Sequence, residues 1–153
     1  MPVPSQADED LLALDRQVCF ALAVASRRVI GLYRPLLEPM GLTHPQYLVM
    51  LALWEREPFT VRSLGEQLSL EPATLSPLLK RLEAIGYITR GRDAEDERTL
   101  RVALTPAGRA LRSSALKIPP AIMARLDMGR DELMELHAVL TSVIAHTQPS
   151  DEL

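Results

Sequence analysis

Two kinds of side chain share the segment from Ser69 to Arg90, and together they suit contact with a nucleic acid. Leucines at helical spacing, some just before this segment, would bury one side of two short helices: Leu64, Leu68, Leu75, Leu78, Leu79 and Leu82. The second helix carries small, hydroxylic and cationic side chains elsewhere: Ala73, Thr74, Ser76, Pro77, Lys80 and Arg81. Small and hydroxylic side chains let a helix enter a major groove, and cations meet phosphates. The pattern predicts a helix-turn-helix that binds double-stranded DNA.

The residues that follow have the character of a β-hairpin with a polar tip. Leu100, Val102 and Leu104 alternate with Arg101 and Ala103, as in a half-buried strand, and residues 87–90 also suit a strand. These two segments enclose the run 91–99, which is too charged to be buried. We interpret the hairpin as the wing of a winged helix-turn-helix. A solvated charged hairpin without a role in DNA binding would have the same composition.

Within this predicted wing, Arg98 is placed to reach a minor groove, where narrow A·T-rich stretches attract guanidinium groups. Asp96 precedes it by two residues and would hold the Arg98 guanidinium through a two-point hydrogen bond. Arg90 and Arg92, at the start of the hairpin, complete the wing residues that we assign to DNA binding.

Composition and charge fit a small regulator. The 153 residues, 24% of them charged and 47% hydrophobic, can build one domain with a real core. No apolar run approaches the ~20 residues of a membrane-spanning helix. Residues 62–112 hold nine Lys or Arg against seven Asp or Glu, while the rest holds eight against thirteen, so +2 and −5 give the net charge of −3. The acidic first ten residues lack the order of a secretion signal, so we expect a cytoplasmic protein.

The hydrophobic periodicity predicts a mainly α-helical chain around the wing. The first helix spans 9–37 with one apolar stripe along its length, and the second spans 44–57 and is ended by Pro58. Thr60 caps a third helix that ends at 68. Pro72 starts the fourth helix, and Gly86 stops it.

Further helices follow the wing. Thr105 caps a helix that begins at Pro106 and runs to 118, prolines 119 and 120 interrupt it, 121–126 continue at an angle, and a last helix spans 130–146. The helices at the two ends carry apolar stripes that a single small lobe cannot bury. We therefore expect a homodimer with interdigitated terminal helices, suited to a pseudo-palindromic operator. We describe 1–153 as a single domain, with dimerisation helices at 8–38 and 107–148 and the DNA-binding lobe at 42–106.

The chain resembles the MarR family of bacterial regulators. The likeness covers the winged-helix lobe at 42–106, with Asp96-Glu97-Arg98 in the wing and Leu104-Thr105-Pro106-Ala107-Gly108 at the next helix. Four further segments, 14–22, 33–37, 45–50 and 75–83, are similar to the organic hydroperoxide resistance regulators within that family. The resemblance implies a dimeric repressor that leaves DNA when a cysteine near its N-terminus is oxidised by an organic peroxide.

Cys19 occupies the position of that cysteine and is the only cysteine of the chain, so an intrachain disulfide is excluded. Its route is thiolate to sulfenic acid, and then a mixed disulfide with a low-molecular-weight thiol or irreversible over-oxidation. We expect Cys19 in mid-helix, away from a helix N-terminus that would favour the thiolate. Hydrogen-bond donors to the thiolate must then come from elsewhere.

The resemblance implies that Tyr33 supplies one donor across the dimer. Tyr33 lies fourteen residues after Cys19, roughly 21 Å along one helix, so only a second copy can bring the two together. Ala23 and His44 stand where the family usually has two further tyrosines. His44 retains hydrogen-bonding capacity and would favour the thiolate if protonated, whereas Ala23 has none.

Other interpretations remain open at the level of sequence. Cys19 would also fit as a small buried hydrophobe, in a regulator released by a small aromatic or lipophilic ligand. A thiol peroxidase is a third class, but no resolving cysteine supports it. No paired carboxylates, nucleophile elbow or phosphate loop indicates another enzyme. The histidines are too scattered for a metal site, and we expect no cofactor.

Overall fold

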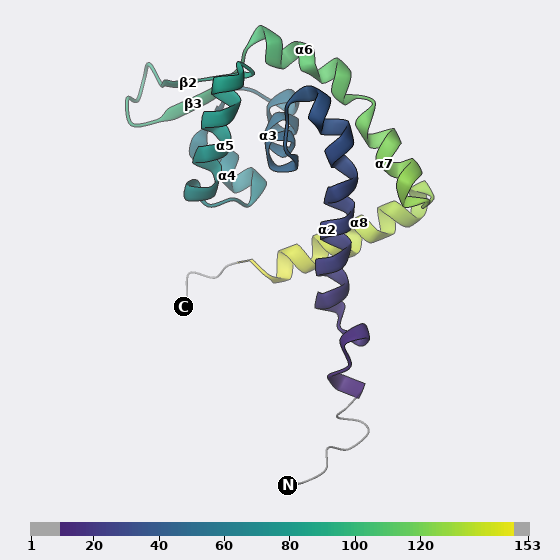
Figure 1. Ribbon diagram of the computed structural model, residues 1–153. Coiled ribbons are helices and arrows are strands. Elements are labelled where there is room, and N and C mark those ends of the chain that lie inside the picture. The colour runs from purple at the N-terminus through teal and green to yellow at the C-terminus, as the bar shows by residue number, and fades with distance from the viewer. Residues whose placement is uncertain (1–9, 149–153) are drawn as a thin grey trace. The chain divides into compact units, whose positions relative to one another are not determined.

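The structure, a computed structural model, describes residues 10–148. The chain divides into two units, 1–118 and 119–153. In chain order the elements are η1 (Leu14–Arg16), α2 (Val18–Leu37), η2 (Glu38–Met40), α3 (His44–Glu55), β1 (Phe59–Thr60), α4 (Val61–Leu68), α5 (Pro72–Ile85), β2 (Ile88–Arg92), β3 (Leu100–Leu104), α6 (Pro106–Ala115), α7 (Ile118–Leu126) and α8 (Arg130–His146) (Figure 1). The predicted class, mainly helical with a small β-hairpin, is confirmed.

The first long helix begins later than its periodicity predicts. Gln17 is extended, with φ −78° and ψ 118°, and separates the short turn η1 from α2. The Gln17 side-chain amide donates to the carbonyl oxygens of Leu11 at 2.7 Å and Ala13 at 3.2 Å, which fixes this break. The prediction of a single helix over 9–37 is therefore wrong at its start. Cys19 becomes the second residue of α2 instead of a mid-helix residue.

The helices of the DNA-binding lobe begin where their capping residues predict. Thr43 and Gln46 form a capping box at α3, and the Thr60 hydroxyl accepts from the backbone N–H of Ser63 at α4. Pro72 is the first residue of α5, and Gly86 ends that helix with φ 99°, in the left-handed region that glycine tolerates best. Helix α3 ends at Glu55, two residues before the predicted end.

A three-stranded antiparallel sheet, of order β1-β3-β2, supports the lobe. Strands β2 and β3 form the predicted hairpin, with Ile88 opposite Leu104 and Arg92 opposite Leu100. Strand β1 pairs with β3 and was not predicted, because two residues are too few to show an alternating pattern. Contacts join α3, α4 and α5 to one another and to the sheet. Leu64, Leu75, Leu79 and Leu82 are buried in this core, whereas Leu68 and Leu78 are half-buried.

The proline pair after α6 does not interrupt a helix. Helix α6 ends at Ala115, and Pro119 and Pro120 lie in the first turn of α7, which begins at Ile118. Backbone N–H groups in a first helical turn have no partner in their own helix, so proline is tolerated there. The predicted break is real but falls before the prolines. In the second unit, α8 has the predicted bounds.

Candidate DNA interface and thiol site

Helix α5 separates its buried side from an exposed side. Leu75, Leu79 and Leu82 pack into the core of the lobe. The six residues of α5 that are predicted to meet DNA are all exposed: Ala73, Thr74, Ser76, Pro77, Lys80 and Arg81. This separation leaves hydroxyl groups and cations on one accessible surface of a 14-residue helix, as a major-groove helix requires.

The tip of the hairpin is held by hydrogen bonds among its own residues. Asp96 Oδ1 accepts from the backbone N–H of Arg98 at 3.0 Å, and its Oδ2 accepts from the Thr99 hydroxyl at 3.1 Å. The expected two-point bond from Asp96 to the Arg98 guanidinium is therefore wrong. Asp96 shapes the turn instead, because a short carboxylate side chain readily accepts from a backbone N–H two residues on. Arg98 itself is exposed at the tip.

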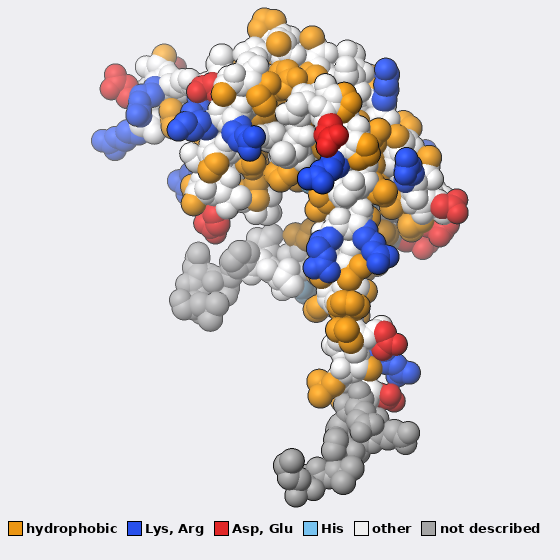
Figure 2. All heavy atoms as spheres, viewed as in Figure 1, with side chains coloured by type: hydrophobic (Ala, Val, Ile, Leu, Met, Phe, Trp, Pro, Cys, Tyr) orange, Lys and Arg blue, Asp and Glu red, His pale blue; other side chains and the backbone are white. Residues whose placement is uncertain are grey.

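Two further arginines of the hairpin are engaged within it. The Arg92 guanidinium donates to the carbonyl of Glu97 at 2.7 Å, and Arg101 pairs with Asp93 at 2.9 Å. Hydrogen bonds from the Glu95 backbone N–H and then from Arg101 lower the pKa of the Asp93 carboxyl. Figure 2 shows Lys and Arg side chains gathered on the hairpin and beside it. Four arginines and four carboxylates balance over residues 88–104, so the hairpin is neutral overall and exposes Arg98 on a turn of fixed shape.

Arg90, which the sequence assigns to DNA binding, is paired with Glu83 in the folded chain. Its guanidinium donates to both carboxylate oxygens of Glu83, Nε to Oε2 at 3.4 Å and an NH2 group to Oε1 at 3.2 Å. The Arg90 backbone N–H donates to the same Oε2 at 3.2 Å. The side-chain hydrogen bond from Arg90 is the main cause of a lowered pKa of the Glu83 carboxyl.

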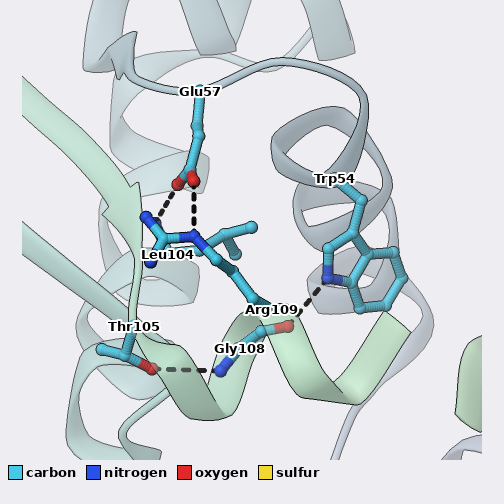
Figure 3. A network of polar contacts seen from close by, with 6 residues as sticks. All are labelled: Trp54, Glu57, Leu104, Thr105, Gly108 and Arg109. Carbon is cyan, nitrogen blue, oxygen red and sulfur yellow. Dashed lines mark hydrogen bonds and ion pairs between the residues drawn. The ribbon is translucent and has the colours of Figure 1, made fainter. Parts of the chain in front are cut away.

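The base of the hairpin is fixed from the other side by a polar network (Figure 3). Glu57 accepts from the backbone N–H of Leu104 at 2.6 Å and from Arg109 Nε at 2.8 Å. The indole N–H of Trp54 donates to the carbonyl of Gly108 at 2.9 Å. Strand β3, helix α3 and helix α6 therefore meet at the start of α6.

Thr105 links this junction to the end of helix α5. Its hydroxyl accepts from the backbone N–H of Gly108 at 3.0 Å, as a helix cap, and donates to the carbonyl of Gly86 at 2.6 Å, where α5 ends. The cap is visible in the sequence, whereas the roles of Trp54, Glu57 and Glu83 are not. The partners of Trp54 and Glu57 lie 47 to 54 residues away, and Glu83 meets Arg90, seven residues on, only because the chain turns between α5 and β2.

Cys19 is exposed in the first turn of α2. The backbone N–H groups of a first helical turn have no partner in their own helix, and Cys19 lies beside them. The expectation that Cys19 lies in mid-helix, away from a helix N-terminus, is corrected by the break at Gln17. In the single chain Cys19 is also not the buried hydrophobe of the alternative interpretation.

Tyr33 and His44 lie together in one aromatic cluster. Their ring centroids are 4.8 Å apart in an edge-to-face arrangement, and Tyr47 lies 5.7 Å from Tyr33. Burial raises the pKa of Tyr33 and lowers the pKa of His44. At neutral pH Tyr33 therefore keeps its hydroxyl proton and His44 is neutral. Both can donate a hydrogen bond, but His44 brings no positive charge to favour a thiolate.

The three predicted redox residues do not meet within one chain. Cys19 and Tyr33 lie on the same continuous helix, fourteen residues and therefore roughly 21 Å apart. His44 lies beside Tyr33 and is therefore also far from Cys19 in the same chain. A thiol at one end and its donors at the other can form a site only when a second chain brings them together.

Metal-ion sites and membrane-spanning helices are both absent from residues 10–148. No group of three or more His, Cys, Asp or Glu side chains in that range is placed to hold a metal ion. None of the helices described there is long and apolar enough to cross a membrane.

Comparison with known proteins places the chain in a family. The family model described as "MarR family" matches residues 42–100. The chain is 42% identical, over 88% of its length and 92% of the relative's, to an organic hydroperoxide resistance transcriptional regulator of Bacillus subtilis.

Solved structures agree with this placement. Reduced AbfR bound to DNA superposes with a TM-score of 0.76 at 34% identity, covering 90% of this chain and 96% of that one. Overoxidized AbfR bound to DNA superposes with a TM-score of 0.75 at the same identity, covering 90% and 97%. AbfR is a protein of Staphylococcus epidermidis. The chain belongs to the MarR family, whose members are transcriptional regulators and not enzymes.

Proposed function

We propose that this protein is a transcriptional repressor that senses organic hydroperoxides through Cys19 and then releases its operator. The observation that carries the proposal is an exposed thiol in the first turn of α2, in a chain whose recognition helix presents an accessible polar face. The Bacillus subtilis relative is named for organic hydroperoxide resistance, which fits this chemistry. A repressor that acts on chromosomal operators works in the bacterial cytoplasm.

The working unit is a homodimer. Helix α8 has no buried residue, and α2 buries only Leu37. Large apolar side chains are exposed along both helices: Val18, Phe20, Leu22, Ile30, Met134, Leu136, Val139, Val143 and Ile144. Such surface is covered by a partner in a stable protein. We therefore keep 8–38 and 107–148 as dimerisation helices that flank the lobe at 42–106 in the sequence.

Dimer formation has a direct test. Because these apolar side chains are exposed in the described part of the chain, we expect a dimer with no stable folded monomer at micromolar concentration. Light scattering should give twice the 17.0 kDa mass of the chain. A mass of one chain, together with full helical circular dichroism at that concentration, would contradict the proposed assembly.

In the dimer, Cys19 of one chain meets Tyr33 and His44 of the other. The thiolate attacks the terminal (hydroxyl) oxygen of the hydroperoxide, and the O–O bond breaks. The alkoxide that leaves takes up one proton, so the products are a sulfenic acid and an alcohol. A low-molecular-weight thiol then displaces the sulfenic hydroxyl as water and leaves a mixed disulfide. The Tyr33 hydroxyl stabilises the thiolate before oxidation, and His44 contributes a neutral hydrogen bond.

Operator release follows from crowding around the oxidised Cys19 at the dimer interface. Oxygen or a thiol adduct inserted among packed helices costs ~1–3 kcal/mol. A change of ~1.4 kcal/mol already alters an equilibrium about tenfold. Overoxidized AbfR is bound to DNA, which favours the larger mixed disulfide as the releasing form in this one-cysteine chain. Ala23 supplies no hydrogen-bond donor, so we expect Cys19 to be oxidised more slowly than the cysteine of regulators that have a tyrosine at this position.

On DNA, the side chains divide by role. Ala73, Thr74, Ser76 and Pro77 form the part of α5 that enters the major groove, where the two hydroxyls face base edges. Lys80 and Arg81 contact phosphates. Asp96 and Arg92 shape the wing, and Arg98 enters the minor groove.

The decisive experiment measures operator binding during oxidation. A duplex selected from random-sequence DNA by the wild-type protein is titrated with and without cumene hydroperoxide, first alone and then with free cysteine. We expect the wild type to lose at least tenfold in affinity when the adduct forms and Cys19→Ser to lose none. Mass spectrometry of Cys19 follows the adduct in the same samples. Equal release of Cys19→Ser would exclude the redox switch and favour a regulator released by a small ligand.

A further inference from the structure

The contact between Glu83 and Arg90 joins the recognition helix to the wing. Glu83 lies in the last turn of α5, one turn beyond Lys80, and Arg90 is the middle residue of β2. Three hydrogen bonds of 3.2–3.4 Å connect them, and both oxygens of the carboxylate are used. A planar guanidinium bound at two points fixes direction as well as distance.

One of these bonds gives a partner to a backbone N–H group at the edge of the sheet. Strand β2 is at the edge, since the strand order is β1-β3-β2. The Arg90 backbone N–H donates to Glu83 instead of to a strand. Glu83 therefore holds both the backbone and the side chain of the same wing residue. An ordinary surface ion pair, in contrast, touches only two mobile side-chain ends.

The other strand of the hairpin is held in the same way, but to a different helix. Glu57 accepts from the backbone N–H of Leu104 in β3 and from Arg109 in α6 (Figure 3). Each strand is thus bound by a carboxylate that also binds an arginine. Of these two carboxylates, only Glu83 belongs to α5, the helix that carries the DNA-facing side chains.

We infer that Glu83 and Arg90 form a brace that sets the wing at a fixed position relative to α5, and that both are positioning residues for operator binding. Arg90 acts through Glu83 and not through a DNA phosphate. The inference rests on the proposed function, in which α5 and Arg98 occupy adjacent grooves of one operator at the same time. A wing that moves independently of α5 must be ordered on binding, which weakens affinity.

For the operator affinity of Glu83→Gln, the brace predicts a change opposite to the one that net charge predicts. Glu83→Gln removes a negative charge beside the DNA-facing surface, so electrostatics alone predicts tighter binding. Loss of the brace predicts weaker binding by about two- to fivefold, the range of exposed ion pairs. Glu38→Gln is the matched control, because Glu38 forms an exposed ion pair with Arg34 at 4.0 Å on α2 and η2.

The experiment measures affinity for the selected operator over a range of salt concentrations. Glu83→Gln, Arg90→Gln and their combination are compared with wild type and with Glu38→Gln. We expect each single substitution to weaken binding about two- to fivefold, and the double variant to be no weaker than either single one. The salt dependence of Arg90→Gln should match wild type, since no phosphate contact is lost. Glu38→Gln should bind like wild type.

A second measurement separates positioning from general stability. Arg98→Ala should weaken binding less in the Glu83→Gln background than in wild type, because the wing is already displaced. A loss of folding alone would not change the effect of Arg98. If Glu83→Gln has reduced helical circular dichroism, Glu83→Asp, which keeps the charge but shortens the reach, takes its place.

Other outcomes overturn the inference. A salt slope lower by about one in Arg90→Gln, with effects that add to those of Glu83→Gln, would make Arg90 a phosphate contact. Glu83→Gln binding as tightly as wild type, or more tightly, would show that the brace does not act on binding. If the wild-type protein selects and binds no operator, the proposed function itself fails, and the brace with it.

Discussion

Gly108→Ala is expected to destabilise the protein more than any other single methyl group added to a glycine of the described chain. A Cβ at this position would lie 2.1 Å from the Tyr87 carbonyl oxygen and 3.2 Å from Leu104 Cδ2. The oxygen belongs to the backbone before β2, so α6 must move away. That movement breaks the bonds of Gly108 to Thr105 and Trp54, each worth ~0.5–1.5 kcal/mol. With the overpacking, the free energy of unfolding should fall by roughly 3–5 kcal/mol.

Gly91→Ala is the control for this measurement. Gly91 lies in β2, and a Cβ there would meet nothing within 4 Å. Urea unfolding at one fixed protein concentration, because a dimer is involved, should show a large drop in midpoint for Gly108→Ala and little change for Gly91→Ala. Equal midpoints for the two variants would mean that the junction of β3 and α6 is looser than the structure describes.

The parts of the fold that sequence predicts well are those governed by local chemistry. Thr43, Thr60 and Thr105 cap helices because a hydroxyl accepts from a backbone N–H three residues on, and this pattern is visible in the sequence. The end of α5 at Gly86 and the strands of the hairpin follow from similarly local rules. The exposed face of α5 follows from its helical period.

The parts that sequence predicts poorly depend on contacts between distant residues or on competition between local ones. Apolar periodicity continues through Gln17, so nothing in the pattern shows that its side chain binds two preceding carbonyls and separates η1 from α2. The placement of Cys19 in a first turn follows from that break. Arg90 was assigned to DNA because it is cationic, whereas Glu83 binds it in the folded chain. Charge alone cannot show which arginine is already paired.

Arg98→Ala is expected to weaken operator binding about tenfold, equivalent to ~1.4 kcal/mol. Asp96 fixes the backbone of the tip through the Arg98 N–H and the Thr99 hydroxyl, so the turn keeps its shape when the guanidinium is removed. The loss should therefore report the minor-groove contact and not a collapsed wing. Because narrow A·T-rich grooves attract guanidinium groups most strongly, the effect should shrink when the wing position of the operator is changed to G·C.

Arg101→Ala provides the comparison within the same hairpin. Arg101 carries the same charge as Arg98, but its guanidinium is bound to Asp93 at 2.9 Å, so its removal should cost the operator complex less. Fluorescence anisotropy at near-physiological salt, with A·T-rich and G·C-rich operators, measures both variants. If Arg98→Ala binds both operators as tightly as wild type, the hairpin is only a charged surface loop. If Arg101→Ala instead shows the larger loss and the A·T preference, the minor-groove residue is Arg101, and the exposed tip of the hairpin has no part in operator recognition.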